Sequence, residues 1–340
     1  MADILRYVDT GSDAAGDGTT SATSSGDNTH AYQSLTQWEV AEDTDLATAN
    51  DTHTVHCNRT NSGGKDTGTC LLFSWGTDAT YYPTITQDDF PATGIYDDTK
   101  YVLSVTNDEC LNVRIDYCKI MKLQIEPTTT GSGNAVGIFW RGAVATATVG
   151  LFADSCILKA NHTSSGMCYG TECNDGDYQI INTIIYNGFD QAVRHTNASH
   201  VGNVFNCTMY GNGIGILRSA GTLNGKNCAI FNCTDDVNGT VVFANCATDD
   251  GEDSGNNGNI TITQSADDWA ALVVDGAGAN FNVTDSSSEL YDAGQADIFP
   301  EDDDIIGTAR PQGSAWDIGA YELIVAAGGI VILRRRIGGY

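Results

Sequence analysis

The chain has 340 residues and carries 44 acidic against 16 basic side chains, a formal net charge of −28. This charge excludes binding to a nucleic-acid backbone and disfavours docking on anionic lipid, because both need a cationic surface. Hydrophobic residues make up 41% of the chain and charged residues only 18%, so the surface must consist largely of Thr, Ser, Asn and Gly. That composition predicts an all-β fold that is rich in turns.

The first fifty residues predict a loop followed by a cap. A stretch rich in Gly, Asp, Ser and Thr runs to about residue 28, and Ser34 with Gln37 then has the spacing of a capping box. Leu35 and Trp38 give the next turns one apolar face, so we expect a single short helix here. Residues 1–6 lack the basic start and apolar run of an export signal, which predicts synthesis in the cytoplasm without a signal peptide.

From residue 54 onward the sequence predicts short strands. Each carries a few β-branched or aromatic residues between Gly, Asn and Asp. The expected early strands cover residues 54–57, 69–73, 84–86, 101–105, 113–115 and 119–125.

A repeat in the central part determines the predicted fold. Five stretches align on a small residue in steps of 27, 24, 21 and 18 residues. Asparagine tolerates the left-handed backbone of a tight turn, and its amide can hydrogen-bond to an equivalent asparagine one coil away. The small residues are Cys156, Thr183, Cys207, Cys228 and Cys246, and the preceding asparagines are Asn182, Asn206, Asn227 and Asn245.

A period near 22 residues predicts a parallel β-solenoid in which the asparagines form one column and the small residues another. A β-sandwich would instead give turns about every 8–12 residues without this recurrence. The eleven cysteines are spread evenly, which favours small buried side chains over a disulfide framework. The closest pairs of cysteines lack the partners that a zinc site needs.

Motifs at the two ends of the repeat resemble those of a known family. The opening motifs are YVD at 7–9, GDGT at 16–19 and AYQSL at 31–35, and the closing motifs are SELYDAG at 288–294, Arg310 and WDIGAYE at 316–322. With the repeat, they make residues 7–322 resemble the right-handed parallel β-helix (pectin-lyase-like) proteins, in particular structural proteins of tailed bacteriophages. The resemblance implies a cap and entry loop over 1–50 and a β-helix with a closing segment over 51–322. Residues 323–340 lie beyond the resemblance and are expected to form a C-terminal tail. Because the fold carries enzymes, adhesins and structural parts, it says little about activity.

An enzyme that cleaves acidic polysaccharides is one alternative. Lyases of this fold use Ca²⁺ on an acidic cluster beside a basic residue that abstracts a proton. Glu172, Asp175 and Asp177 would hold the ion, and Arg194 or His195, one coil later, would supply the base. A glycosidase would need two carboxylates about 5–10 Å apart, which so acidic a chain could supply by accident. The scarcity of cations argues against both, and the simplest interpretation is a loop with solvated acids.

Acidic runs in the last third suggest a second place for calcium. Residues 228–308 contain 17 Asp and Glu and no basic side chain. Asp249, Asp250 and Asp253 could bind Ca²⁺ through closely spaced oxygens, although they lack the fixed spacing of an EF-hand. Solvated loops are the alternative, and no other cofactor is expected.

The C-terminal tail has the opposite charge to the remainder of the chain. Residues 324–340 carry three arginines and no acid, so the preceding residues carry −31. The apolar run at 323–333 is too short to span a membrane but suffices for one β-strand. We expect a docking segment formed by Ile330, Ile332, Arg334, Arg335, Arg336 and Tyr340, which pairs with an exposed sheet edge and with carboxylates of a partner. A tail folded on its own coils is the alternative.

These observations predict a non-enzymatic structural or adhesive protein. It would act as a repeated component of a phage virion or an extracellular filament, through contacts with itself, with neighbouring proteins and with glycans. The alternatives are a tailspike-type depolymerase and a carbohydrate-binding surface module.

Overall fold

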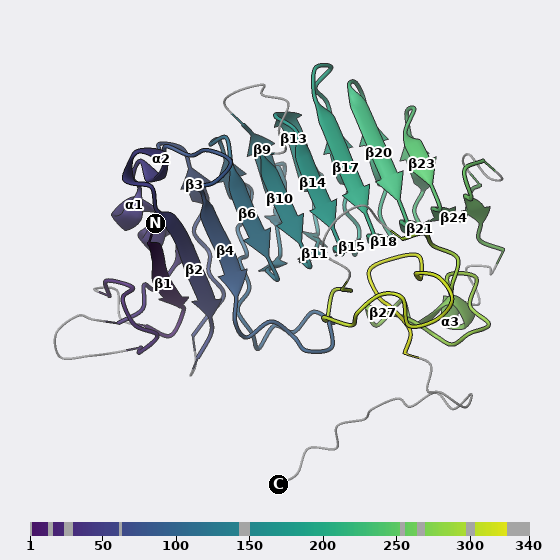
Figure 1. Cartoon of the computed structure of the whole chain (residues 1–340), viewed down its shortest axis with the longest axis horizontal. Helices are drawn as coiled ribbons and strands as arrows, with labels where there is room; N and C mark the ends of the chain where they lie inside the picture. Colours follow the sequence, from purple (N-terminus) through teal and green to yellow (C-terminus); the bar gives the residue numbers. More distant parts are fainter. Residues whose placement is uncertain are drawn as a thin grey trace, which may run out of the picture.

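The structure, a computed structural model, describes residues 2–12, 16–23, 30–60, 63–142, 150–251, 256–263, 269–296 and 303–324. Three sheets of parallel strands wind around one core, and successive coils stack along the long axis of the molecule (Figure 1). The predicted all-β parallel β-helix is thereby confirmed.

The strands divide among the sheets as follows. Sheet 1 contains β1 (Asp3–Asp9), β2 (Thr52–Asn58), β4 (Pro83–Gln87), β6 (Cys118–Met121), β10 (Leu151–Asp154), β14 (Tyr178–Ile181), β17 (Val201–Phe205), β20 (Thr222–Lys226) and β23 (Val242–Ala244). Sheet 2 contains β7 (Gln124–Ile125), β11 (Ile157–Lys159), β15 (Ile184–Tyr186), β18 (Thr208–Tyr210), β21 (Ala229–Phe231), β24 (Ala247–Thr248) and β25 (Ile260–Thr261). Sheet 3 contains β3 (Cys70–Leu72), β5 (Glu109–Val113), β9 (Ala135–Arg141), β13 (Cys168–Asp175), β16 (Gln191–His195), β19 (Ile214–Arg218) and β22 (Asp235–Asn238). Two small sheets pair β8 (Thr128–Thr129) with β12 (Asn161–His162) and β26 (Val273–Asp275) with β27 (Asn280–Val283), and the helices are α1 (Leu35–Glu42), α2 (Leu46–Ala49) and α3 (Trp269–Leu272).

The tight turn from sheet 1 to sheet 2 explains the asparagine repeat. Strand pairing places Asn182, Asn206, Asn227 and Asn245 at equivalent positions of consecutive coils, each with φ between 48° and 52°. Asparagine adopts this left-handed backbone more readily than most other side chains, and the Asn227 side chain also donates to Asn206 Oδ1 (3.0 Å).

The small residue after each turn forms a second hydrogen-bonded column. Thr183 Oγ1 donates to the Ile181 carbonyl (2.8 Å) and accepts from the Cys156 amide one coil earlier (3.3 Å). The Cys228 amide likewise donates to Cys246 Sγ (3.4 Å). The position therefore needs a small side chain that both donates and accepts, because the tight turn leaves a buried amide without a sheet partner.

Three of the expected early strands differ from the structure. The strand expected at 113–115 lies earlier in the chain, since β5 ends at Val113. Residues 119–125 form two strands, since Lys122 at φ 50° takes the position of the turn asparagine. Residues 101–105 form only isolated bridges at Leu103. In these coils no asparagine marks the turn, so the sequence pattern merges separate elements.

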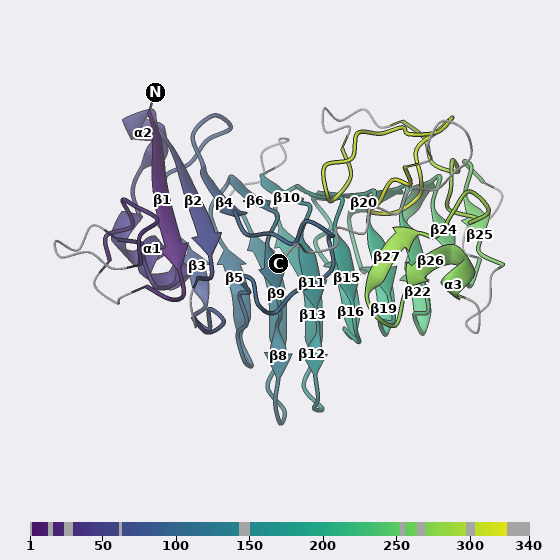
Figure 2. The ribbon, with the colours of Figure 1, turned by 90° about the horizontal axis from the view of Figure 1, so that it is seen from below.

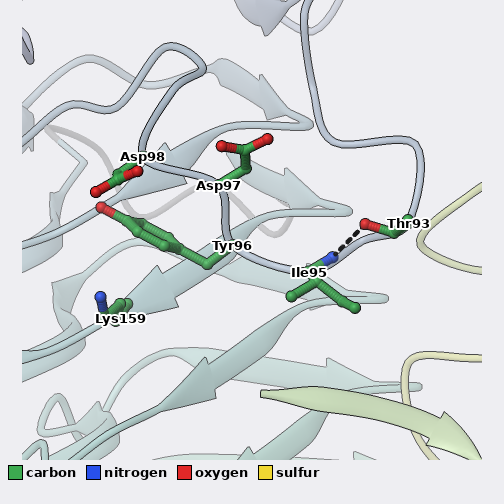
Figure 3. Close-up of a pocket in the computed structure, with 6 residues that line it drawn as sticks. All are labelled: Thr93, Ile95, Tyr96, Asp97, Asp98 and Lys159. Carbon is green, nitrogen blue, oxygen red and sulfur yellow. Dashed lines mark hydrogen bonds between the residues drawn. The ribbon is translucent and has the colours of Figure 1, made fainter. Parts of the chain in front are cut away.

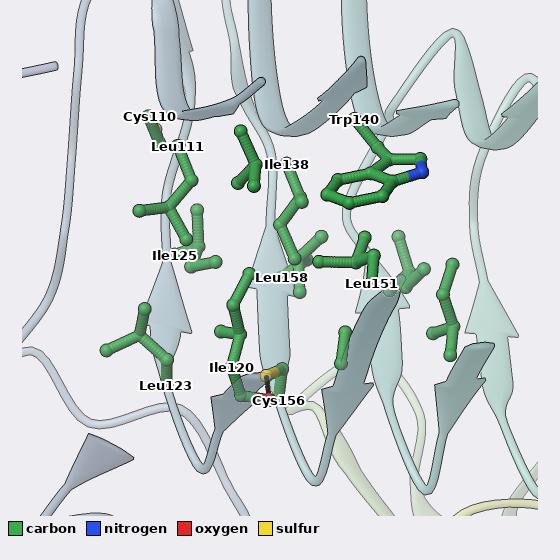
Figure 4. Packing of buried hydrophobic residues seen from close by; sticks show 14 of the residues in the cluster. Cys110, Leu111, Ile120, Leu123, Ile125, Ile138, Trp140, Leu151, Cys156 and Leu158 are labelled. Atoms are coloured by element: carbon green, nitrogen blue, oxygen red, sulfur yellow. Dashed lines mark hydrogen bonds between the residues drawn. The ribbon is translucent and has the colours of Figure 1, made fainter. Parts of the chain in front are cut away.

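The core is a continuous apolar column inside the three sheets. Figure 4 shows Leu111, Ile120, Ile138 and Leu158 meeting from strands of all three sheets, with the Trp140 indole beside them. All eleven cysteines are unpaired and ten of them are buried. Burying one such aliphatic side chain contributes roughly 1.5–3 kcal/mol, so the stacked core supplies the main stabilisation.

The N-terminal end of the core is closed by α1. Ser34 is its N-cap and accepts from the Gln37 amide (3.2 Å), as the capping-box spacing predicts. Trp38 of this helix packs against Trp75, with ring centroids 5.1 Å apart. Helices α2 and α3, of four residues each, are additional to the single helix expected.

The outer face of sheet 2 is covered by the chain itself (Figure 2). Phe281 of β27 packs on Tyr186 and Tyr210, and residues 303–324 continue over the same sheet. The Asn227 side chain holds this closing segment through a pair of hydrogen bonds with the Gln295 backbone (2.7 and 2.9 Å). The turn asparagines thus serve as docking points as well as turn residues.

A buried ion cluster fixes the closing segment. Arg310 donates to the carbonyls of Asp317 (3.0 Å) and Gly319 (2.9 Å), and its guanidinium lies 3.4 Å from Glu322. Both side chains of this pair are essentially inaccessible to solvent. The closing motif of the sequence therefore holds the closing segment on sheet 2 through buried hydrogen bonds and an ion pair.

Candidate functional site

The predicted catalytic residues fall into two separate groups. Glu172 and Arg194 are neighbours on β13 and β16 and form an ion pair of 2.8 Å on the outer face of sheet 3. Asp175 and Asp177 instead flank the buried His200, at 2.9 and 3.2 Å from its two ring nitrogens. The three acids each have a cationic or imidazole partner, so they do not converge on one ion.

Arg194 is poorly suited to act as a base. Its guanidinium is held by Glu172, and such a group stays protonated in proteins. It also lies over the Tyr169 ring, 4.8 Å from the centroid. The other proposed base, His195, is 1% exposed inside the core, where burial lowers its pKa. Neither of the two proposed bases is therefore an exposed proton acceptor.

The outer face of sheet 3 repeats this arginine–aromatic contact. Arg141 of β9 lies 4.1 Å from the Phe139 centroid, and Phe139 packs with Tyr169 in a small apolar cluster outside the main core. Glu172 pairs in register with Phe139, and Arg194 follows on the next strand. Phe139 and Tyr169 are only 4% and 8% exposed beside these guanidinium groups, so the surface presents the planar cations and the Glu172 carboxylate, which can bind sugar hydroxyl groups through hydrogen bonds.

A second polar cluster lies on sheet 2. The buried Glu126 accepts from Lys65 Nζ (2.6 Å) and the Tyr96 hydroxyl (2.6 Å), and Lys159 Nζ lies 3.7 Å from it. Burial opposes the ionisation of Glu126, but these donors outweigh it and lower its pKa. The cluster fastens the loop that contains Tyr96 onto the β-helix.

An open pocket adjoins this cluster (Figure 3). It has a volume of about 450 Å³ and is lined by Thr93, Ile95, Tyr96, Asp97, Asp98 and Lys159. Tyr321 of the closing segment donates to the Thr93 carbonyl (3.3 Å), so the loop and the closing segment meet beside the pocket. The Lys159 ammonium faces the Tyr96 ring at 4.3 Å, which leaves the pocket wall polar and of mixed charge.

Two of the acids proposed for calcium lie beside a third that sequence analysis did not identify. Asp236 accepts from the Asp249 amide (2.8 Å), and its own amide donates to Asp250 (2.9 Å). Burial, followed by the Asp249 carboxylate, raises the pKa of Asp236 to about 9. Asp253 lies outside the described residues, and the described part of the chain gathers no group of three Asp, Glu, His or Cys side chains with the geometry of a metal site.

The tail residues 330, 332, 334–336 and 340 also lie outside the described residues. No helix within the described ranges is long and apolar enough to cross a membrane.

Comparison with protein-family models, with curated proteins and with solved structures finds no match to this chain. The candidate sites are therefore described by the geometry of their own residues. The Glu172–Arg194 pair could have been found by aligning the coils, since the two residues are one coil apart. The Lys65–Glu126–Lys159 cluster gave no signal, because its members come from coils of unequal length.

Proposed function

We propose that this protein is a non-enzymatic β-helix component of a repeated assembly, such as a tailed-phage virion or an extracellular filament. In this proposal residues 325–340 supply the contact between copies, and the outer face of sheet 3 is an adhesive surface for glycans.

The main support is the distribution of covered and open faces. The chain's own closing segment covers sheet 2, whereas sheet 3 leaves Arg141 exposed and Arg194 partly exposed beside their aromatic partners. A stiff stack of coils whose sheet 2 is covered and whose sheet 3 is open suits a building block that presents a surface.

The assembly part is tested on the full chain by sedimentation velocity and negative-stain electron microscopy. We expect concentration-dependent, regular oligomers that dissociate when Arg334, Arg335 and Arg336 are all changed to Glu. Oligomers that are unchanged by this triple variant, or a monomer at every concentration, would contradict the proposal.

The adhesive part is tested by affinity electrophoresis in gels that contain polygalacturonate, alginate or dextran. We expect retardation that is lost when Arg141 and Arg194 are both changed to Ala. Lys119→Ala is the matched control, because Lys119 lies over Phe152 (4.8 Å) on sheet 1 and should not affect retardation. The same polymers are assayed for new reducing ends and unsaturated sugars, and sustained release of either would replace this proposal by a depolymerase.

A further inference from the structure

Large apolar side chains of α1 and of the β3 region are exposed at the N-terminal end of the β-helix. Val40 on α1 is 74% exposed, Phe73 after β3 is 61% exposed, and Leu71 on β3 is 37% exposed. Helix α1 runs beside this strand, since Thr36 donates to the Thr69 carbonyl (3.0 Å). Exposed apolar side chains on two adjacent elements of an otherwise polar surface are typical of an interaction site.

Two carboxylates flank the apolar side chains. Glu39 on α1 and Asp43, the C-cap of this helix, lie one helical turn apart. Glu39 faces Trp75 and Asp43 faces Ser74. Within the described residues, neither forms an ion pair with Lys, Arg or His. Burial, and then the charge of Asp43, raise the pKa of Glu39 to about 7. A cation that approached this pair would relieve the repulsion between the two acids.

The chain itself contains a segment with complementary chemistry. Residues 325–340 combine Ile330, Val331, Ile332 and Leu333 with three consecutive arginines and no acid. The segment follows Ile324, which is 55% exposed, and 16 residues can extend over roughly 50 Å. Because the remainder of the chain carries −31, two copies repel each other unless a cationic segment lies between them.

We propose that Glu39, Val40, Asp43, Leu71 and Phe73 form an acceptor surface that binds residues 325–340 of a second copy. This inference rests on the proposed assembly and names the surface that receives the tail. The apolar residues of the tail pack on Val40, Leu71 and Phe73, and its arginines pair with Glu39 and Asp43. Such a contact joins different surfaces of the two copies, so its repetition builds a ring or a filament.

The test measures the self-association constant of full-length variants by sedimentation velocity. We expect Val40→Ser with Phe73→Ser, and separately Glu39→Gln with Asp43→Asn, to weaken association by about tenfold or more, the equivalent of one lost charged contact. Val242→Ser is the matched control, because Val242 is 57% exposed at the far end of the β-helix. The association constant of this control should stay within about twofold of the wild-type value, because surface substitutions that remove no contact have effects of about this size.

A charge exchange identifies the occupant. Arg334, Arg335 and Arg336 changed to Glu on one copy, and Glu39→Lys with Asp43→Lys on another, should each abolish association, while a mixture of the two should form hetero-oligomers. If the arginine variant dissociates but neither acceptor variant does, the acceptor surface is wrong and the proposed assembly stands. If the mixture fails to associate, residues 325–340 do not bind a second copy at this surface. If the arginine variant still assembles, both the inference and the tail-mediated assembly fail.

Discussion

Replacing Asp236 with Asn should remove a large part of the pH dependence of stability. Asp236 is fully buried, accepts from the Asp249 amide (2.8 Å) and has its pKa raised to about 9. An unfolded aspartate has a pKa near 3.9, so the folded state binds one proton more than the unfolded state between about pH 4 and 9. Stability contributed by this proton is fully present below about pH 4 and falls as the pH rises to about 9, by up to about 1.4 kcal/mol per pH unit.

Between pH 5 and pH 7 the wild type should therefore lose up to about 2.7 kcal/mol that Asp236→Asn retains. The asparagine keeps an acceptor for the Asp249 amide and cannot ionise. Urea unfolding at pH 5, 6, 7 and 8 measures the difference, and the adjacent Asp235→Asn is the control because the Asp235 carboxylate accepts from Asn238 (2.9 Å) in a more exposed position. Parallel pH profiles for the wild type and Asp236→Asn would refute the argument, because they would mean that Asp236 ionises normally in the folded protein.

Three further changes test the hydrogen-bonded columns and the closing segment. Asn227→Ala should destabilise the protein by about 3–4 kcal/mol in urea unfolding, because alanine is strained at a φ of 51° and the bonds to Asn206 and Gln295 are lost. Asn227→Gly relieves the strain and should cost about 1–2 kcal/mol less. Equal costs for the two variants would contradict the role of the left-handed turn. In the native protein at pH 8, a thiol reagent should react with Cys233 at most, since the other ten cysteines are buried. All eleven cysteines should react in urea. Rapid labelling of several thiols in the native protein would refute the burial of the cysteine column. Arg310→Met should lower the free energy of unfolding by about 3–5 kcal/mol, because it leaves Glu322 buried without its cation. Limited proteolysis of this variant should then cut residues 303–324 first. An unchanged cleavage pattern would show that the ion cluster does not hold the closing segment.

The central coils could be predicted from sequence because one local constraint repeats in each of them. Every turn from sheet 1 to sheet 2 needs a left-handed residue followed by a small hydrogen-bonding one, and Asn206-Cys207 and Asn227-Cys228 satisfy both needs with the same pair. Where Lys122 or Ser155 takes the left-handed position, the same geometry has no distinctive residue. Strand boundaries in the early coils were therefore predicted less well.

The surfaces were harder to predict because they depend on coil length and on segments far apart in sequence. Glu126 meets Lys159 because β7 pairs with β11, and it meets Lys65 because bridges stack Asp66, Leu103 and Ile125 in consecutive coils. It meets Tyr96 only because a long loop turns back over sheet 2. Nothing local indicates that the closing segment covers sheet 2 and leaves sheet 3 open. The acceptor surface at Val40 and Phe73 likewise depends on α1 lying beside β3.

The acidic excess has a structural origin that composition alone does not reveal. Asp304 accepts from the amides of Ile306, Thr308 and Glu322 (3.0, 2.7 and 3.0 Å), and Asp66 and Asp292 make similar contacts in other loops. A carboxylate offers two strong acceptors and no donor, so it satisfies several loop amides at once, whereas an asparagine would bring two donors that need partners of their own. Burial raises the pKa of Asp66 and of Asp304, which is the cost in solvation of placing carboxylates inside these loops. Since so much of the negative charge is fixed by the loops it holds, repulsion between copies is inherent in the fold, and it favours contacts that place a cationic segment between them.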